Sequence, residues 1–389
     1  MMFRSLSAPA LAAVLCAGAV SAAEIRFAPG TALTLNPAYP PRGMSDVFAQ
    51  MVAIRMGPRE RLNVELVRFE LLKGGRVIAT QVQTSEEAAA RTRAFLQDRP
   101  AHLQASQFLE RKGLAGWFGG DAAAATSASL APNQVLLEPD VYFAVDGQPD
   151  TLRVVVQGQA ADGPKQIEAT VPIKSYQSPI DYRLPVRGAW LEASLPLMQS
   201  HHRWNAPTEY AVDFFKVNGQ GETVHDGTAD ASHWYAYGEP VMAAADGEVV
   251  EVINDRVQDR AFLAPRPGES ADQRSERVNR EIESRALADF PQNLLGNIIV
   301  LRHRAGETVE YSSYDHLKTG SARVKVGDHV KQGDVIAEVG DTGDTPVVHL
   351  HFEVNAGPDT LYSQSLPFRF SGMTRDGSTQ DPGWFVESK

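Results

Sequence analysis

The chain has 389 residues, which is enough for two domains and too many for one ordinary core. Its composition, 43% hydrophobic and 22% charged, is that of a globular protein and argues against disorder. The formal net charge of −11 argues against a nucleic-acid partner and against a polybasic membrane anchor, because both favour clustered positive charge.

The first residues have the pattern of an export signal. Arg4 supplies a positive charge, and the apolar run Leu11–Val20 is only about ten residues long, too short to span a membrane. Small residues follow at positions 21 to 23. We therefore predict a secretory signal peptide over residues 1–23, a protein exported to the periplasm or the extracellular medium, and no stable membrane span after cleavage. A retained membrane anchor is the alternative.

The only cysteine, Cys16, lies inside this segment. The mature protein then has no cysteine, so any metal site must use histidine, aspartate or glutamate.

Residues 24–185 have the pattern of a mostly β domain with a helical interruption. The strand-like runs 63–72 and 76–83 are separated by two glycines, a hairpin signal, and Thr84 with Glu87 forms a capping box that begins a helix. Short strand-like runs return over 134–171, with a predicted break between 137 and 141. We expect a β-sandwich with an immunoglobulin-like arrangement as one option. No catalytic constellation is visible here, which favours a structural or binding module.

A second domain is predicted over residues 186–389. It is β-rich and punctuated by glycine, except at about 255–292. There a charged run carries Val278, Ile282 and Ala286 four residues apart, which predicts an amphipathic helix with a thin apolar stripe. We interpret this segment as a helical insertion at the rim of an all-β domain, with a lid as an alternative role.

Two histidines alternate in an apolar, strand-like run near the end of the second domain. His349 and His351 flank Leu350, so they share one face of the predicted strand, about 6–7 Å apart. Two imidazoles on one face can serve one metal-centred site, one binding the ion while the other reaches substrate or water.

Five pieces occur in order in this domain: Glu209–Phe214, Tyr237–Val250, Gly296–His303, Tyr311–Leu317, and a glycine-spaced run from Val324 that leads into His349-Leu-His351. Together they resemble the lysostaphin-like metallopeptidases, whose domain is the all-β duplicated hybrid motif. The resemblance covers about residues 188–355.

The resemblance implies a zinc ion held by a histidine, an aspartate four residues later, and the second histidine of the H-x-H pair. The last two correspond to Asp213 and His351. The remaining two family histidines correspond to His316 and His349, and they would act as proton carriers and transition-state donors beside a zinc-activated water. The implied substrate is a peptide bond in bacterial peptidoglycan or its stem peptides.

One position departs from the family pattern. Four residues before Asp213 stands Glu209, where the family has its first histidine ligand. Three outcomes are open: Glu209 itself binds zinc, His202 or His201 folds back to replace the missing histidine, or the site holds no metal. The sequence therefore supports two functions, a zinc metalloendopeptidase and a metal-free pseudo-peptidase that binds peptidoglycan or regulates another cell-wall enzyme.

Overall fold

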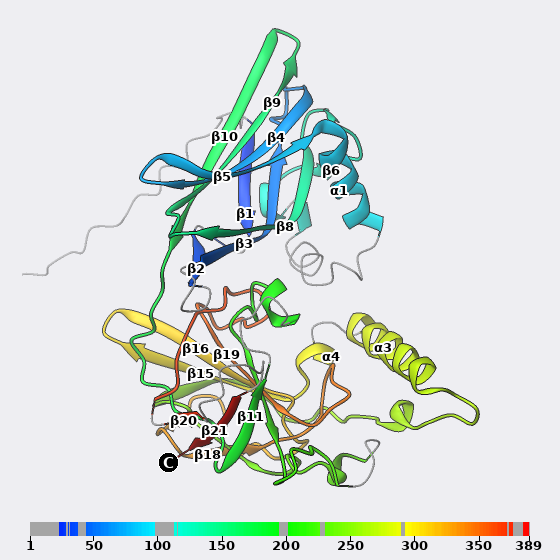
Figure 1. Cartoon of the computed structure of the whole chain (residues 1–389), viewed down its shortest axis with the longest axis vertical. Coiled ribbons are helices and arrows are strands. Elements are labelled where there is room, and N and C mark those ends of the chain that lie inside the picture. The colour runs from blue at the N-terminus through cyan, green and yellow to red at the C-terminus, as the bar shows by residue number, and fades with distance from the viewer. Residues whose placement is uncertain are drawn as a thin grey trace, which may run out of the picture.

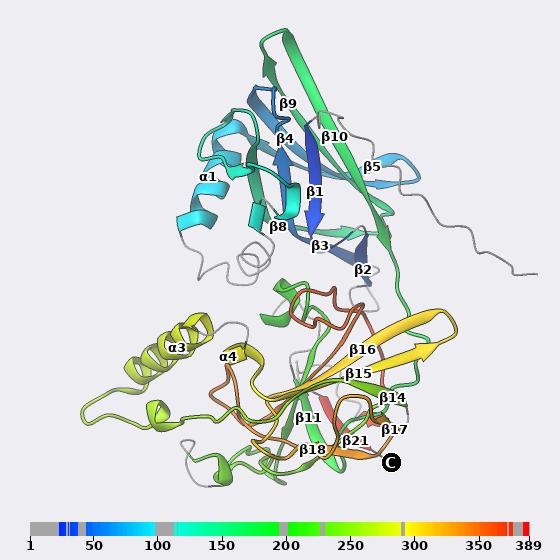
Figure 2. The same ribbon diagram turned by 180° about the vertical axis from the view of Figure 1, so that it is seen from behind.

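The computed structural model describes residues 23–28, 30, 32–37, 44–97, 113–114, 116–193, 201–225, 230–288, 292–371, 373–375 and 384–388. Apart from residue 23, the predicted signal peptide lies outside these ranges. Within them, no helix combines the length and the apolar character needed to cross a membrane. The fold is mostly β, as predicted, and its two parts are stacked along the long axis of the molecule (Figures 1 and 2).

The N-terminal part contains one ten-stranded sheet among the described residues, in the order β5-β4-β9-β10-β2-β3-β8-β6, with β1 beside β3 and β7 beside β4. Its strands are β1 (Glu24–Ala28), β2 (Leu33–Pro37), β3 (Met44–Arg55), β4 (Leu62–Lys73), β5 (Arg76–Thr84), β6 (Ala123–Ala124), β7 (Ser129–Leu130), β8 (Gln134–Asp146), β9 (Thr151–Ala160) and β10 (Gly163–Lys174).

The two halves of this sheet share one apolar core. They are joined through a short parallel contact between β10 and β2. The core takes Val47 from β3, Phe69 from β4 and Val154 from β9, so both halves bury side chains in the same space. This packing agrees with the predicted sandwich, while the immunoglobulin-like arrangement stays a prediction.

Local sequence signals in this part correspond to observed structure. The β4–β5 hairpin turns at Gly74 and Gly75, both with positive φ, which glycine adopts without strain. Helix α1 (Ser85–Gln97) begins with the predicted capping box, because the Thr84 and Glu87 side chains each accept from the other's backbone N–H.

The predicted break between 137 and 141 is wrong, since β8 is continuous. Proline removes one donor at 139, but pairing with β3 extends on both sides of it.

The C-terminal part contains an antiparallel nine-stranded sheet, in the order β17-β14-β15-β16-β19-β12-β11-β21-β20, and the small pair β13-β18, counted over the described residues. Its strands are β11 (Ala189–Ala193), β12 (Val212–Lys216), β13 (Pro240–Met242), β14 (Gly247–Ile253), β15 (Ile298–Ala305), β16 (Thr308–Asp315), β17 (His329–Val330), β18 (Val335–Glu338), β19 (Leu350–Asn355), β20 (Met373–Arg375) and β21 (Trp384–Ser388).

The expected helical segment lies between β14 and β15. It contains the 3-10 turn η4 (Ala261–Leu263) and the helices α3 (Ala271–Ala288) and α4 (Gln292–Leu295). Helix α3 stands at the side of the C-terminal part (Figure 1). The thin apolar stripe of α3 faces a small separate core. Val278 packs there with Phe262 and Leu263, and Ile282 packs against the same core.

The connection between β10 and β11 runs along the C-terminal sheet. Hydroxyl groups of Tyr176, Ser178 and Tyr182 donate to the carboxylate of Glu310 on β16, at 2.6, 2.8 and 2.8 Å. The predicted domain boundary at residues 185 and 186 lies within this connection.

Candidate metal centre

Three neighbouring strands place acidic and imidazole side chains side by side. In the register of the sheet, His351 on β19 is directly opposite Asp213 on β12 and also opposite Asp315 on β16. Directly opposite residues point to the same face of a sheet. All three side chains are buried, so the sheet itself brings the predicted Asp213 and His351 together.

Three histidines surround the Asp213 carboxylate. His351 Nδ1 lies 3.1 Å and His349 Nε2 lies 3.4 Å from Asp213 Oδ1. His202 Nε2 lies 3.6 Å from Asp213 Oδ2. His202 is carried by the 3-10 turn η2 (His201–Trp204), eleven positions before Asp213.

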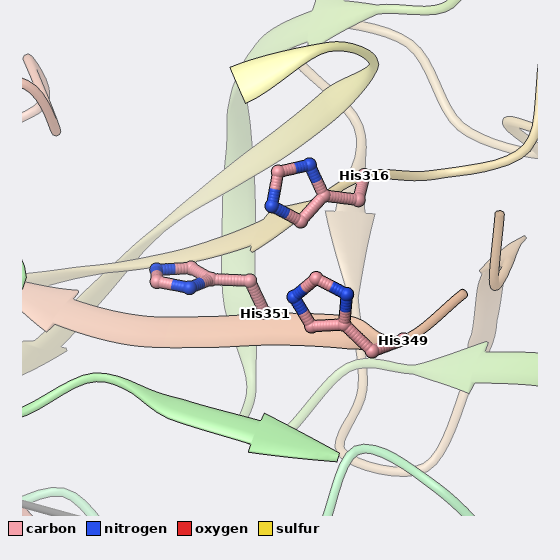
Figure 3. Close-up of side chains that lie close together, drawn as sticks. All are labelled: His316, His349 and His351. Atoms are coloured by element: carbon pink, nitrogen blue, oxygen red, sulfur yellow. The ribbon is translucent and has the colours of Figure 1, made fainter. Parts of the chain in front are cut away.

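His316 completes the cluster from the end of β16. Its ring centroid lies 4.8 Å from that of His349 and 6.0 Å from that of His351, and the three rings face one space in Figure 3. Its Nδ1 lies 2.7 Å from the carbonyl oxygen of Thr342, so Nδ1 carries the proton and Nε2 is the accepting nitrogen. His316 has φ 60°, in the left-handed region that non-glycine residues adopt at a cost of about 1–3 kcal/mol.

Ligand atoms that lie within 4.8 Å of one another form three groups among the described residues: His202, Asp213 and His351; His316, His349 and His351; and Asp315, His351 and Glu353. The first group offers two imidazoles and one carboxylate, a donor set that suits a catalytic zinc ion and leaves a coordination position for water. The residues present therefore fit the metal.

Glu209 belongs to none of these groups. Its buried carboxylate forms an ion pair with Arg203, and Arg203 also pairs with Asp46 of β3. Burial raises the pKa of Glu209 to about 7 against the opposing charge of Arg203. In the structure Glu209 therefore pairs with Arg203. His202, the other candidate to replace the missing histidine ligand, lies beside Asp213.

The electrostatic character of the cluster follows from its burial and its pairing. Burial raises the pKa of Asp213, but the charges of His202 and His349 and hydrogen bonds from His349 and His351 outweigh it and hold the pKa well below the usual range. Burial and the neighbouring His349 and His351 lower the pKa of His316 well below the usual range. His316 is therefore neutral near pH 7 and able to accept a proton.

Two buried carboxyl groups behind His351 were not found by sequence reasoning. Glu353 Oε2 lies 3.4 Å from His351 Nε2, and Asp315 accepts a hydrogen bond from the Ser313 hydroxyl. Burial raises the pKa of Glu353 to about 7 and that of Asp315 to about 6. The alternation of 349, 351 and 353 along one strand was the available signal for Glu353.

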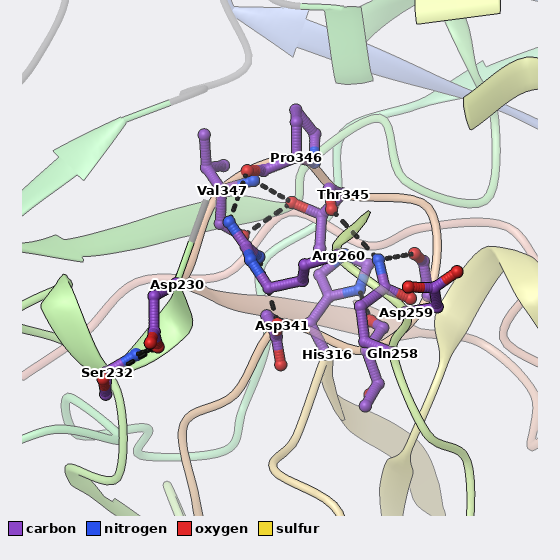
Figure 4. Close-up of polar contacts among 12 residues, drawn as sticks. Asp230, Ser232, Gln258, Asp259, Arg260, His316, Asp341, Thr345, Pro346 and Val347 are labelled. Carbon is purple, nitrogen blue, oxygen red and sulfur yellow. Dashed lines mark hydrogen bonds and ion pairs between the residues drawn. The ribbon is translucent and has the colours of Figure 1, made fainter. Parts of the chain in front are cut away.

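The segment after β14 is hydrogen-bonded to the loop 341–347, which also contacts His316 (Figure 4). Gln258 donates to the carbonyl oxygens of Gly343 and Thr345 at 3.2 and 3.4 Å. Arg260 donates to Asp341 at 3.0 Å and to the carbonyl oxygen of Pro346 at 3.1 Å.

The same loop approaches the backbone at Gly296. A Cβ there would lie 2.4 Å from Thr342, so only glycine permits this contact. Thr342 in turn accepts the hydrogen bond from His316.

Two surface cavities adjoin this loop. One, of about 500 Å³, includes Asp230, Tyr237, Arg260 and Asp341 in its wall. The other, of about 370 Å³, is lined by residues that include Gly296 and Gly343. The wall of neither cavity includes a histidine of the cluster.

A β domain with buried imidazoles around one carboxylate has the donor set of a transition-metal site. Residues 285–362 match the family model described as Peptidase family M23, a segment that includes His316, His349 and His351. The resemblance of this chain to the lysostaphin-like peptidases is therefore confirmed.

Solved structures were also compared. The catalytic domain of the antimicrobial peptidase lysostaphin from Staphylococcus simulans is 23% identical, over 45% of this chain and 84% of that chain, with a TM-score of 0.23. A structure of LytU is 23% identical, over 40% of this chain and 68% of that chain, also with a TM-score of 0.23. A mutant catalytic domain of the prophage-encoded M23 protein EnpA from Enterococcus faecalis is 15% identical, over 49% and 90%, with a TM-score of 0.24. No curated protein sequence matches the chain. The family assignment therefore rests on the match to the family model.

Proposed function

We propose that this protein is an exported zinc metalloendopeptidase that hydrolyses peptide bonds of bacterial peptidoglycan. One observation carries the proposal: His202, Asp213 and His351 offer ligand atoms within 4.8 Å of one another, and His316 and His349 lie beside them. The match to peptidase family M23 supports the reaction class.

In this proposal His202, Asp213 and His351 hold the zinc ion. Such an ion polarises a scissile carbonyl and lowers the pKa of water. Glu209 is not a ligand, because it is committed to the ion pair with Arg203.

His316 and His349 have complementary positions for moving a proton. The hydrogen bond from His316 Nδ1 to Thr342 leaves Nε2 to accept a proton from water and to return it to the leaving amine. His349 is stacked against Phe215 with ring centroids 5.2 Å apart. In this proposal it is the second imidazole beside the metal and donates a hydrogen bond to the developing oxyanion.

A metal-free binding protein is the second candidate, favoured by Glu209 at the position where the family has a histidine. Such a protein would bind stem peptides or regulate another cell-wall enzyme. The candidates differ in metal content, because a site with two protein ligands binds zinc much more weakly than a site with three.

Zinc content and muropeptide release measured on wild type, H202A, H351A and H201A test the proposal. We expect about one zinc per chain in wild type and in H201A, and little in H202A and H351A, with muropeptide release following zinc content. The neighbouring H201A is the matched control for H202A. A metal-free wild type that binds muropeptides without cleaving them would favour the second candidate, and full zinc content in H202A would remove His202 from the ligand set.

A further inference from the structure

We propose that the N-terminal sheet completes the metal centre, because Asp46, acting through Arg203, holds the turn that carries His202. Asp46 and Arg203 are positioning residues in this inference, which rests on the proposed function. The metal affinity of the C-terminal part would then depend on a residue 156 positions before His202 in the chain.

The two residues after His202 are both fixed to the N-terminal sheet. The guanidinium of Arg203 is fully buried between the carboxylates of Asp46 and Glu209 and pairs with both. Its Cζ also lies 5.7 Å from the ring centroid of Phe48 and 6.0 Å from that of Tyr142. Arg203 is therefore held by one charge from each part of the molecule and by two aromatic rings of the N-terminal sheet.

Trp204 adds an aromatic contact from the same turn. Its ring meets Tyr142 on β8 at a centroid distance of 4.9 Å and Phe48 on β3 at 5.9 Å, both in edge-on geometry. Aromatic pairs at these distances contribute beyond simple burial. The contacts of Arg203 and Trp204 thus converge on the same small area of β3 and β8.

The turn needs this external support. Element η2 is a four-residue 3-10 helix, and such short helices are marginal on their own. His202, in the same turn, reaches the cluster, with its ring edge-on to His351 at a centroid distance of 4.7 Å. Because adjacent residues share one rigid turn, a turn anchored at 203 and 204 also fixes the position of the 202 side chain.

Glu209 acquires a role from the same arrangement. Standing where the family has a histidine ligand, it is the C-terminal partner of Arg203. We infer that Glu209 does not bind the metal but holds Arg203, and with it the turn η2. That turn then supplies His202 as the ligand in place of the family's histidine.

The experiment compares the affinity of full-length, metal-stripped protein for Co²⁺ and Zn²⁺, by chelator competition and by the visible absorption of bound Co²⁺. The variants are D46N and F48L, both on β3 of the N-terminal sheet. The control is T34V, because Gln364 donates to Thr34 at 2.6 Å across the same boundary without contacting η2. We expect metal affinity to fall about 10–100-fold in D46N and F48L, the range found when a group that orients a metal ligand is lost, and to stay unchanged in T34V.

Wild-type affinity in a folded D46N would overturn the inference. Thermal unfolding shows whether each variant is folded, and if D46N is not, wild-type affinity in F48L overturns the inference instead. Equal losses in T34V and D46N would also overturn it, since any disturbance of the boundary would then suffice. A wild type that binds no metal contradicts the proposed function itself and is recognised before any variant is made.

Discussion

At the scale of single residues, Glu353 is placed to orient His351. Its carboxylate lies 3.4 Å from Nε2, while Nδ1 of the same ring faces Asp213 at 3.1 Å. A metal-binding histidine commonly donates its other N–H to a carboxylate, and loss of that partner typically costs 10- to 100-fold in metal affinity. We expect E353Q to bind zinc about 10-fold more weakly than wild type in chelator competition.

The control for this substitution is E310Q, which also neutralises a buried carboxylate in the same sheet. Glu310 bonds to hydroxyl groups of the connection between β10 and β11 and does not contact His351. Zinc affinity should be unchanged in E310Q. An equal loss in both variants would show a general effect of the sheet rather than orientation of His351.

Glu138 on β8 gives a pH-dependent prediction far from the metal centre. Burial raises its pKa to about 7, from an ordinary 4.5, although Arg91 opposes the shift. The folded state then binds more protons than the unfolded state between these pH values, so the free energy of unfolding falls as pH rises through this window. Glutamine resembles the neutral form of Glu138, so in E138Q this contribution to the fall in the free energy of unfolding with pH is absent.

From pH 4 to pH 8 we expect the stability of E138Q, relative to wild type, to improve by about 3 kcal/mol, since one pKa unit corresponds to about 1.4 kcal/mol. Urea denaturation at several pH values measures this change. The exposed Glu65 on β4 is the control position, and E65Q should follow the wild-type pH profile. Parallel profiles for E138Q and wild type would contradict the prediction.

The residues of the site differ in how far sequence could predict them. Resemblance to the family motifs predicts Asp213, His316, His349 and His351, and the structure brings all four together. The choice between Glu209 and His202 could not be made from spacing, because it depends on contacts of η2 with a distant part of the chain. Asp315 was missed for a related reason: its neighbour His351 lies on a strand that only the sheet register identifies.

At the scale of elements, the segment between β14 and β15 acts as a brace for the loop 341–347. Arg260, nearly buried, bonds to both Asp341 and Pro346 in that loop. The loop in turn provides the Thr342 carbonyl for His316 and places the Thr345 hydroxyl 3.4 Å from His349 Nδ1. A small displacement of this loop would move both histidines that the proposed reaction uses.

We therefore expect R260M to lower kcat by about 10–100-fold with zinc content unchanged, since misplacement of a reacting group by about 1 Å costs this much. The matched control is R280M on α3, whose side chain is 71% exposed and pairs only weakly with Glu276. R280M should keep wild-type kcat. Loss of zinc in R260M would show that the brace acts on the ligands instead.

Sequence predicts well the elements that depend on neighbouring residues. It does not predict the elements that depend on pairing with a distant strand. The hairpin at Gly74 and the capping box at Thr84 are encoded within a few residues. By contrast, β8 remains one strand through Pro139 because β3 pairs along it, which no local pattern shows. The pairing of β19 with β12, which builds the candidate metal centre, likewise joins segments more than 100 residues apart in the chain.

At the scale of the whole molecule, two buried polar contacts of different chemistry stand out, one between the two parts and one at the connection that joins them. One is the Asp46–Arg203–Glu209 cluster, where opposite charges meet in a buried setting. The other is the connection between β10 and β11, which is tied to the C-terminal sheet by hydroxyl groups. A buried charged acceptor makes such hydrogen bonds stronger than neutral ones.

The second contact can be released without touching the metal centre. Leucine at position 310 would remove the acceptor for Tyr176, Ser178 and Tyr182 at once, leaving the buried Tyr182 hydroxyl without its partner at a cost of about 1–3 kcal/mol. The connection should then open locally, and limited proteolysis of E310L should cut within residues 175–187 about 5- to 100-fold faster than in wild type, because each 1.4 kcal/mol raises the open population tenfold. Glu307, exposed in the turn between β15 and β16, provides the control E307L, which should be cut at the wild-type rate. Equal cutting of E310L and wild type would mean that packing of Tyr182 against Phe352 and Phe368 holds the connection without the hydrogen bonds.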